Sequence, residues 1–381
     1  MSKRVLILGA GQMQVPIIEC VNSMNYYSIV ADMDPNAPGF QYAKESLFIS
    51  TLDYELLLEY CKEHPVDGVL TTSDYPVNVV AKISSECGLK AMSVDTANWC
   101  TNKFLQRERL KISGINTPSY VIVRNALLPD EILKEITFPV VVKPVDSSAS
   151  RGVQRVNDIT NLYTAVEDAN IISKTNTVIV EDFIEGREYS VETFTQNGET
   201  KVIAITEKQI IGEEYGCFVE DTHVQPAKLD EILKLQIIEE IEKVTKALLF
   251  DNCPGHIEIK LNKNGINIIE AACRLGGDYI TSDLVPLSTG VNMLECLVYA
   301  SLGETIDLNP KVNKNSAIQF INTTNYARCV DFISSGNKNI QRAELLPYSS
   351  NIIKSSLDRL GYIILQTDTF DELDTILKGI K

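Results

Sequence analysis

The chain is poor in the residues that mark several common classes of protein. It has only three histidines, His64, His223 and His256, so a histidine-rich metal centre is not expected. Its nine cysteines are scattered and form no CxxC pair. We therefore predict neither a zinc site nor a disulfide framework, and interpret the cysteines as reduced cytosolic thiols. No apolar run approaches the roughly 18 residues that a transmembrane helix needs.

Positive charge is also scarce. Lysine and arginine number 35 against 51 aspartates and glutamates, for a net charge of −16, which argues against a nucleic-acid surface. The apolar part of the opening segment MSKRVLILGAG is too short for a signal peptide. With 44% hydrophobic and 23% charged residues among 381, the chain is expected to be a soluble, cytoplasmic protein of two or three domains.

Residues 1–115 alternate strand and helix patterns, which predicts a small doubly wound α/β domain with polar residues at the strand ends. The turn Gly9-Ala10-Gly11 follows the first strand, and an acid follows later at Asp32 or Asp34. The third glycine of the dinucleotide fingerprint is missing. A domain that binds a small substrate, or nothing, is favoured over a dinucleotide site.

A hairpin is predicted in GHIEIKLNKNGINIIEAACRLGGDY, residues 255–279, with Lys263-Asn264-Gly265 as its loop. This register places Glu258 directly opposite Glu270. One face would carry His256, Glu258, Lys260, Glu270, Ala272 and Arg274, and the other Ile257, Ile259, Leu261, Ile269 and Ala271. Opposed carboxylates repel unless a hard cation such as Mg²⁺ lies between them. The alternative is a solvated sheet face on which like charges meet.

Other polar residues suit a nucleotide. Lys143 ends the apolar strand PVVVK and precedes the loop DSSASRG (146–152), whose hydroxyl and backbone N–H groups suit phosphate oxygens. Lys103 is a second candidate phosphate lysine. Glu181 could accept from an adenine amino group and Glu188 could bind a ribose diol. Alternatively, all four are ordinary exposed charges.

Taken in order, these segments resemble the ATP-grasp superfamily of carboxylate–amine or carboxylate–thiol ligases. The resemblance covers nearly the whole chain. It is strongest to the group that includes phosphoribosylglycinamide synthetase, formate-dependent formyltransferase and the carboxylase ATPase subunit of purine synthesis, and to amino-acid ligases. It implies an N-terminal preATP-grasp domain (1–115), a central ATP-grasp domain (116–308) and a small C-terminal α+β domain (309–381). The central domain would divide into a lid-bearing subdomain (116–187) and a metal-binding subdomain (188–308).

The resemblance also implies roles for particular residues. ATP phosphates would be held by Lys103 and Lys143 and covered by Ser147, Ser148, Ser150, Arg151 and Gly152. The adenosine would be held by Glu181, Glu188 and the Phe183-Ile184 backbone, and Mg²⁺ (or Mn²⁺) by Glu258 and Glu270. Arg274 would stabilise an acyl phosphate or hold a substrate carboxylate. Many members carry asparagine where this chain has Ala272, so the number of metal ions stays open.

The residues expected near the acceptor are Ser73, Asp74, the neighbours Glu207 and Lys208, His223 and Arg274; His223 could instead be a loop histidine with no chemical role. The expected substrates are a small carboxylate and an amine, with a purine-synthesis enzyme as the alternative. A non-catalytic nucleotide-binding subunit and an NAD(P)-dependent oxidoreductase are alternatives of other classes. A homodimer is expected by resemblance.

Overall fold

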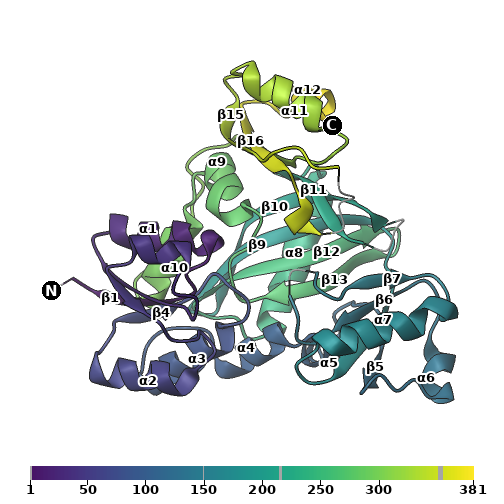
Figure 1. Cartoon of the computed structure of the whole chain (residues 1–381), viewed down its shortest axis with the longest axis horizontal. Helices are drawn as coiled ribbons and strands as arrows, with labels where there is room; N and C mark the ends of the chain where they lie inside the picture. Colours follow the sequence, from purple (N-terminus) through teal and green to yellow (C-terminus); the bar gives the residue numbers. More distant parts are fainter. Residues whose placement is uncertain (1, 149, 214–216, 351–354) are drawn as a thin grey trace.

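The computed structural model describes residues 2–148, 150–213, 217–350 and 355–381. The N-terminal region is built around a four-stranded parallel sheet in the order β3-β2-β1-β4, at the left of Figure 1. Its elements are β1 (Arg4–Leu8), η1 (Gln12–Gln14), α1 (Val15–Ser23), β2 (Tyr27–Ala31), η2 (Pro38–Tyr42), β3 (Glu45–Leu47), α2 (Tyr54–Glu63), β4 (Gly68–Leu70), α3 (Val77–Glu86), α4 (Val94–Thr101) and α5 (Lys103–Ile112).

Both faces of this sheet are covered, because successive side chains of β1 point to opposite sides. Leu6 and Leu8 pack in one core with residues of α2 and α3. Val5 and Ile7 pack in another with α1 and with α10 (Met293–Ser301), which returns from far along the chain. The predicted doubly wound α/β domain is therefore confirmed, with one covering helix drawn from outside residues 1–115.

The next region forms a separate antiparallel sheet in the order β5-β8-β6-β7. Its elements are β5 (Tyr120–Arg124), α6 (Asp130–Glu135), β6 (Val140–Pro144), β7 (Gln154–Val156), α7 (Ile159–Ile172) and β8 (Thr177–Asp182). Valines from the strands and apolar residues of α7 form its own core. This compact lobe lies at the lower right of Figure 1 and carries the serine loop between β6 and β7.

The largest sheet has eight strands in the order β13-β12-β9-β10-β11-β14-β16-β15. Its central part comprises β9 (Arg187–Gln196), β10 (Glu199–Ile211), β11 (Val219–Gln225), α8 (Glu231–Ala247), β12 (Cys253–Asn262), β13 (Gly265–Ala272), the π-helix η4 (Ile280–Leu284), α9 (Val285–Thr289) and α10. The C-terminal part comprises β14 (Asn315–Phe320), α11 (Tyr326–Ser334), β15 (Ile340–Leu345), η5 (Ser356–Asp358), β16 (Gly361–Thr367) and α12 (Phe370–Ile380).

The C-terminal region is α+β, as predicted, and it continues the central sheet, because β14 pairs with β11. The metal-candidate hairpin β12–β13 stands at the opposite edge. Among the described residues, no helix combines the length and the apolar character needed to cross a membrane.

Candidate active site

The hairpin places Glu258 opposite Glu270, as the sequence predicts, but by a different route. Asn262 pairs with Gly265, so the loop has two residues, Lys263 and Asn264, and not three. A β-bulge then shifts the register, because Glu258 pairs with Glu270 while Ile259 pairs with Ile268. The extra residue is Ile269. The bulge restores the opposition that the longer loop was expected to produce.

The bulge corrects the predicted division of β13 between core and cleft. Ile268, not Ile269, lies in the hydrophobic core, and Ile269 lines the same cavity as Glu270. Strict alternation from Ile268 would have sent Glu270 into the core. The bulge turns Glu270 toward the cleft.

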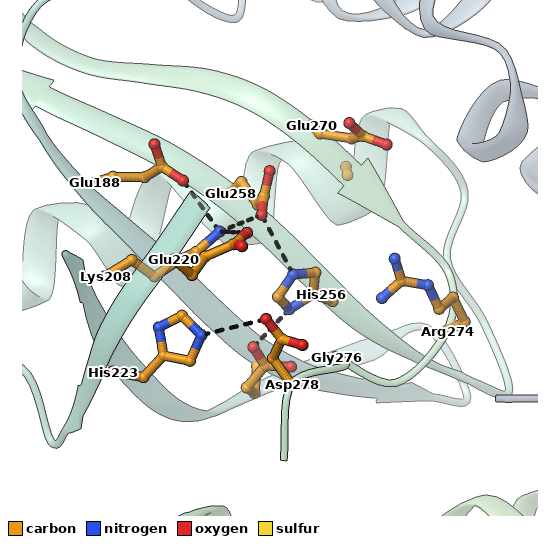
Figure 2. Close-up of polar contacts among 12 residues, drawn as sticks. Glu188, Lys208, Glu220, His223, His256, Glu258, Glu270, Arg274, Gly276 and Asp278 are labelled. Carbon is orange, nitrogen blue, oxygen red and sulfur yellow. Dashed lines mark hydrogen bonds and ion pairs between the residues drawn. The ribbon is translucent and has the colours of Figure 1, made fainter. Parts of the chain in front are cut away.

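Glu258 lies in a network of charged side chains (Figure 2). Lys208 Nζ donates to its Oε1 at 2.6 Å and also lies 3.0 Å from Glu188 and 3.7 Å from Glu220. His256 Nε2 lies 3.7 Å from Glu258. Burial alone would raise the pKa of Glu258, but Lys208 and His256 outweigh it and hold that pKa well below the usual range. Glu258 is therefore ionised.

His256 connects Glu258 to a buried acid. Its Nδ1 lies 2.7 Å from Glu192 Oε1, and both side chains are buried. Burial alone would lower the pKa of His256, but the Glu192 carboxylate outweighs it and, with Glu258, raises that pKa to about 9. His256 also pairs across the hairpin with Ala272, the position where many superfamily members carry asparagine. The ring held by Glu192 thus belongs to the residue that pairs with Ala272.

Glu270 has a different cation. Lys103, the first residue of α5, donates to Glu270 Oε1 at 3.2 Å and to the Ser147 carbonyl at 2.8 Å. The lysine is buried. It therefore joins the metal-candidate carboxylate to the serine loop.

Lys143 lies beside a buried glutamate. Glu181 accepts from Lys143 Nζ with one oxygen and from Arg107 Nε with the other, both at 2.7 Å. Burial alone would raise the pKa of Glu181, but Arg107 and Lys143 outweigh it and lower that pKa to about 2. The carboxylate thereby fixes the Lys143 ammonium at the cleft, a contact that the sequence does not predict.

Most of the predicted site residues line one cavity, of about 110 Å³. It brings together both predicted lysines, both predicted metal carboxylates, all three loop serines and all four adenosine candidates. Those residues are Lys103, Lys143, Ser147, Ser148, Ser150, Glu181, Phe183, Ile184, Glu188, Glu258 and Glu270. Phe183 donates its backbone N–H to the Pro139 carbonyl. The cationic groups of Lys260 and Arg155 lie over the Phe183 ring.

A second cavity, of about 320 Å³, adjoins the first. The two share Lys103, Ser147, Ser148 and Glu270. Polar side chains of the N-terminal region line the second cavity: Asp74, Tyr75, Asn78, Asn98, Thr101 and Asn102. Two buried oxygens in these walls, Asn78 Oδ1 and Ser147 Oγ, have no hydrogen-bond partner in the described part of the chain. Buried polar atoms of this kind suit a bound molecule or water.

Arg274 is paired with Asp74, which lines the second cavity, although Arg274 itself lines neither cavity. Its Nε donates to Asp74 Oδ1 at 2.6 Å, and its Nη1 donates to the Leu275 carbonyl. Burial alone would lower the pKa of Arg274, but Asp74 outweighs it and raises that pKa. Ser73 precedes this pair, and its backbone N–H donates to Thr71.

His223 lies in β11, not in a loop, and its side chain is fully buried. Its Nε2 lies 3.9 Å from Asp278 Oδ2, and Figure 2 marks this contact with a dashed line. Arg359 from the C-terminal region donates to Asp278 at 2.9 Å and to Glu220 at 3.1 Å. The C-terminal region thus contributes a cation to the edge of the cleft. Asp278 and Tyr279 both have positive φ, a backbone conformation that concentrates at functional sites.

Of the two neighbouring candidates near the acceptor, only Lys208 lies at the cleft, and the role of each stays a prediction. Lys208 lines the nucleotide-candidate cavity, and Glu207 lines neither cavity. The two side chains point to opposite faces of β10 because successive residues of a strand alternate. Sequence alone did not establish which of the two faces the cleft.

The serine loop is held against the N-terminal region. Arg151 donates to the hydroxyl of Tyr75 and stacks over its ring at 5.1 Å. Gly152 has a φ of +73°, and a Cβ there would lie 2.8 Å from Ile172 Cδ1. The loop therefore requires glycine at this position.

The donor set suits a hard cation only in part. Among the described residues, no group of three or more histidine, cysteine or acidic side chains is arranged to hold a metal. Glu258 and Glu270 nonetheless offer ionic oxygens on facing strands. Two carboxylates suit Mg²⁺ when phosphate and water supply the other ligands.

The backbone of the N-terminal glycine turn is already hydrogen-bonded by an aspartate of the same domain. Ala10 N–H donates to Asp32 Oδ2 at 2.9 Å, and the Ala10 carbonyl accepts from Gly39. Asp32 thus stabilises the turn that a dinucleotide would need to approach.

Comparison with known proteins bears on this arrangement. Residues 136–283 match the ATP-grasp domain family. The chain contains an ATP-grasp domain. That domain spans the lysine strand, the serine loop and the carboxylate hairpin, so the predicted resemblance is confirmed.

Relatives of the chain include ATP-grasp ligases. It is 28% identical over 249 residues to alanine–anticapsin ligase of Bacillus subtilis, covering 58% of this chain and 51% of that ligase. It is 26% identical to formate-dependent phosphoribosylglycinamide formyltransferase of Bacteroides fragilis, over 71% of this chain and 70% of that enzyme. The crystal structure of L-amino acid ligase from Bacillus licheniformis is similar over 100% of this chain and 97% of that one, with a TM-score of 0.81 and 21% identity. The match to alanine–anticapsin ligase therefore spans only about half of that protein.

Several residues at the cleft were not predicted as site residues from sequence. They are Arg107, Glu192, Glu220, His256 and Arg359. Arg107 lies four residues after Lys103 on α5, and residues at that spacing share a helix face. This spacing was the available indication.

Proposed function

We propose that the chain is an ATP- and Mg²⁺-dependent ligase that activates a small carboxylate as an acyl phosphate for attack by an amine. One observation carries the proposal. Two cavities meet at Lys103, Glu270, Ser147 and Ser148, so a nucleotide in one would present its terminal phosphate to a substrate in the other. Proximity of this kind supplies a large part of the rate in phosphoryl and acyl transfer.

In this proposal Lys103 and Lys143 neutralise phosphate charge, and the serine loop covers the phosphates. Glu258 and Glu270 would hold Mg²⁺, which, when bound, supplies electrostatic stabilisation of the transferred phosphoryl group. The Phe183-Ile184 segment and Glu188 would contact the adenosine. Glu181 has both oxygens on cations, so its main part in the proposal is to position Lys143.

The reaction transfers the terminal phosphoryl of ATP to a carboxylate oxygen and releases ADP. The amine then attacks the acyl carbon, the C–O bond to phosphate breaks, and the amine loses a proton. Arg274 holds Asp74, which lines the second cavity, and its guanidinium would be suited to stabilise the anionic carboxylate or acyl phosphate. Closure of the serine loop would keep water from the acyl phosphate.

The charge distribution favours amino-acid-like substrates over a phosphoribosyl substrate. A phosphate monoester carries close to two negative charges and is held by cations or free backbone N–H groups. Here six cations at the cleft already face carboxylates, while Lys174 of the second cavity lies over the Tyr75 ring. The six pairs are Lys103–Glu270, Lys143–Glu181, Lys208–Glu258, Lys260–Glu213, Arg274–Asp74 and Arg359–Asp278. The Ala10 N–H of the glycine turn is bound by Asp32.

The partly polar second cavity suits an amino acid better. Asn78 Oδ1 is a buried acceptor without a partner in the described chain, which suits an ammonium or amide donor. His223, buried in β11, stays a candidate substrate contact, although it lines neither cavity. A ribotide substrate remains the second candidate because of the relationship to the formyltransferase.

The experiment that tests the proposal measures ADP and phosphate release from Mg²⁺-ATP with pooled acceptors. The pools are amino acids, organic acids with amines, phosphoribosylamine with glycine, and formate with glycinamide ribonucleotide. Stimulation by an amino-acid pool, with a new amide detected by mass spectrometry, is the expected result. ATP binding without stimulation by any pool would favour a non-catalytic nucleotide-binding subunit, and saturable NADH binding without ATP binding would favour an oxidoreductase.

A homodimer and a cytoplasmic location complete the proposal by family resemblance. Sedimentation velocity of the purified chain tests the first, and cell fractionation tests the second.

A further inference from the structure

Side chains of helix α5 hydrogen-bond to the free edge of the metal-candidate hairpin. β13 is the outermost strand of the eight-stranded sheet, so its outward backbone groups have no strand partner. Gln106 meets both outward groups of Ala271, donating to its carbonyl at 2.6 Å and accepting from its N–H at 2.9 Å. Arg107 Nη2 donates to the Ile269 carbonyl at 2.5 Å. We call Gln106 and Arg107 the edge clasp.

The edge clasp encloses Glu270. Its two hydrogen-bonded residues, Ile269 and Ala271, are the neighbours of Glu270 on either side. Ile269 is the extra residue of the bulge, and the bulge is what turns Glu270 from the core to the cleft. The edge clasp therefore holds the backbone on both sides of Glu270, where the strand changes the face to which its side chains point.

Arg107 also acts on the phosphate side of the cleft. Its Nε donates to Glu181, whose other oxygen accepts from Lys143. One guanidinium thus joins the bulge beside Glu270 to the carboxylate beside Lys143. The planar fork of arginine can serve both acceptors at once, whereas a lysine ammonium is a single compact point.

The clasp residues are buried, so their contacts are not incidental surface bonds. Gln106 is 1% exposed and Arg107 is 0% exposed. Lys103, Gln106, Arg107 and Leu110 are the buried residues of α5, and their spacing makes them one face of the helix. Three of the four are polar. An amphipathic helix would ordinarily bury apolar residues there.

We propose that Gln106 and Arg107 are positioning residues that set the direction of Glu270 and thereby the affinity of the site for the divalent cation. The inference rests on the proposed function, because it assigns Glu270 to the metal. Groups that orient metal-ligating carboxylates typically alter metal affinity 10- to 100-fold when removed. Neither residue lines the nucleotide-candidate cavity. Arg107 nevertheless acts on it through Glu181 and Lys143, whereas Gln106 lines the second cavity, so a change at Gln106 leaves the proposed nucleotide contacts in place.

The test uses the full chain and three variants. Gln106→Leu removes both bonds to Ala271 without altering charge, and Arg107→Lys keeps a cation for Glu181 but loses the fork. Asn116→Ala is the matched control, since the Asn116 side chain donates to the Ile266 carbonyl at 3.0 Å on the same edge but near the hairpin loop. Mn²⁺ affinity is measured by electron paramagnetic resonance in the presence of a non-hydrolysable ATP analogue, and thermal unfolding confirms that each variant is folded.

The expected result is that Gln106→Leu and Arg107→Lys weaken Mn²⁺ binding about tenfold or more, while Asn116→Ala leaves it near the wild-type value. Wild-type Mn²⁺ affinity in folded Gln106→Leu would overturn the inference, as would an equal loss in Asn116→Ala. If Arg107→Lys does not fold, Gln106→Leu still decides the question. If the wild-type chain binds neither the analogue nor Mn²⁺, the proposed function itself fails. If the wild-type chain binds both and the variants bind Mn²⁺ equally well, only the role of Gln106 and Arg107 fails.

Discussion

Glu258 lies directly across the β12–β13 hairpin from Glu270, and each carboxylate is held by a different cation. Lys208 donates to Glu258 at 2.6 Å, and Lys103 lies 3.2 Å from Glu270. Directly opposed carboxylates are destabilising on a sheet, so the two lysines offset that repulsion. Both carboxylates face the same cavity, each beside a lysine.

Glu270→Gln is expected to lower Mg²⁺-dependent turnover by at least about 100-fold while the fold is retained. The change removes a metal-ligating charge without changing volume, and loss of one electrostatic group at a transition state has this typical size. Steady-state ADP release at saturating ATP provides the measurement.

Glu207→Gln is the matched control for that variant. It makes the same chemical change on the face of β10 away from the cleft, so turnover should stay near the wild-type value. Near-wild-type turnover in folded Glu270→Gln would remove the metal assignment.

Lys143→Ala is expected to weaken ATP binding about 10- to 100-fold, because it removes a charge-assisted contact of roughly 1.5–3 kcal/mol. Titration calorimetry measures this affinity directly. Lys263→Ala, at the exposed tip of the hairpin, should bind ATP as the wild type does. Unchanged affinity in folded Lys143→Ala would make that lysine structural.

The stability difference between wild type and Glu181→Gln is expected to depend on pH. The pKa of Glu181 is lowered from 4.5 to about 2, so its ion pairs stabilise the fold fully above about pH 4.5 and lose that effect as the pH falls toward 2. The difference in unfolding free energy should therefore shrink by about 2 kcal/mol between pH 4.5 and pH 3.

Urea unfolding of both proteins across this range measures the effect. Glu199→Gln, which alters an exposed acid, should show no comparable dependence. A difference that stays constant from pH 4.5 to pH 3 would contradict the ion-pair assignment of Glu181.

Arg274→Ala is expected to lower turnover about 100-fold or more with little change in ATP affinity. Arg274 pairs with Asp74, a residue of the second cavity, and it does not line the nucleotide-candidate cavity. Comparing kcat with the calorimetric affinity for ATP separates the two effects. A loss of ATP affinity equal to the loss of turnover would place Arg274 in nucleotide binding instead.

Much of the site is predictable because its residues occur in a recognisable order. Glu258 and Glu270 were matched from strand alternation and an Asn-Gly turn. The actual two-residue loop and the bulge at Ile269 could not be predicted. Either loop length suits the same sequence, and the bulge residue is bonded by Arg107 of α5, which is distant in sequence. A one-residue shift in register changes the face of every side chain. Here the loop is one residue shorter than predicted, which shifts the register by one residue. The bulge at Ile269 shifts it back, so Glu258 still pairs with Glu270.

Other features depend on which face of an element becomes buried. Glu207 and Lys208 are adjacent, and only the completed sheet decides that the lysine faces the cleft. His223 was ambiguous between loop and strand until β11 was seen to pair with both β10 and β14. Arg107 resembles an ordinary surface arginine in the polar sequence of α5. Its burial follows from the approach of β13, which is distant in sequence.

The pairing of β14 with β11 limits how this protein can be divided or recombined. A fragment ending at residue 308 would leave the length of β11, including His223, as an unpaired edge, and exposed edges of this kind invite aggregation. It would also lose Arg359, which holds Glu220 and Asp278 at the cleft. The last 70 or so residues therefore complete the sheet that carries the cleft, and they are not expected to be exchangeable as an independent module.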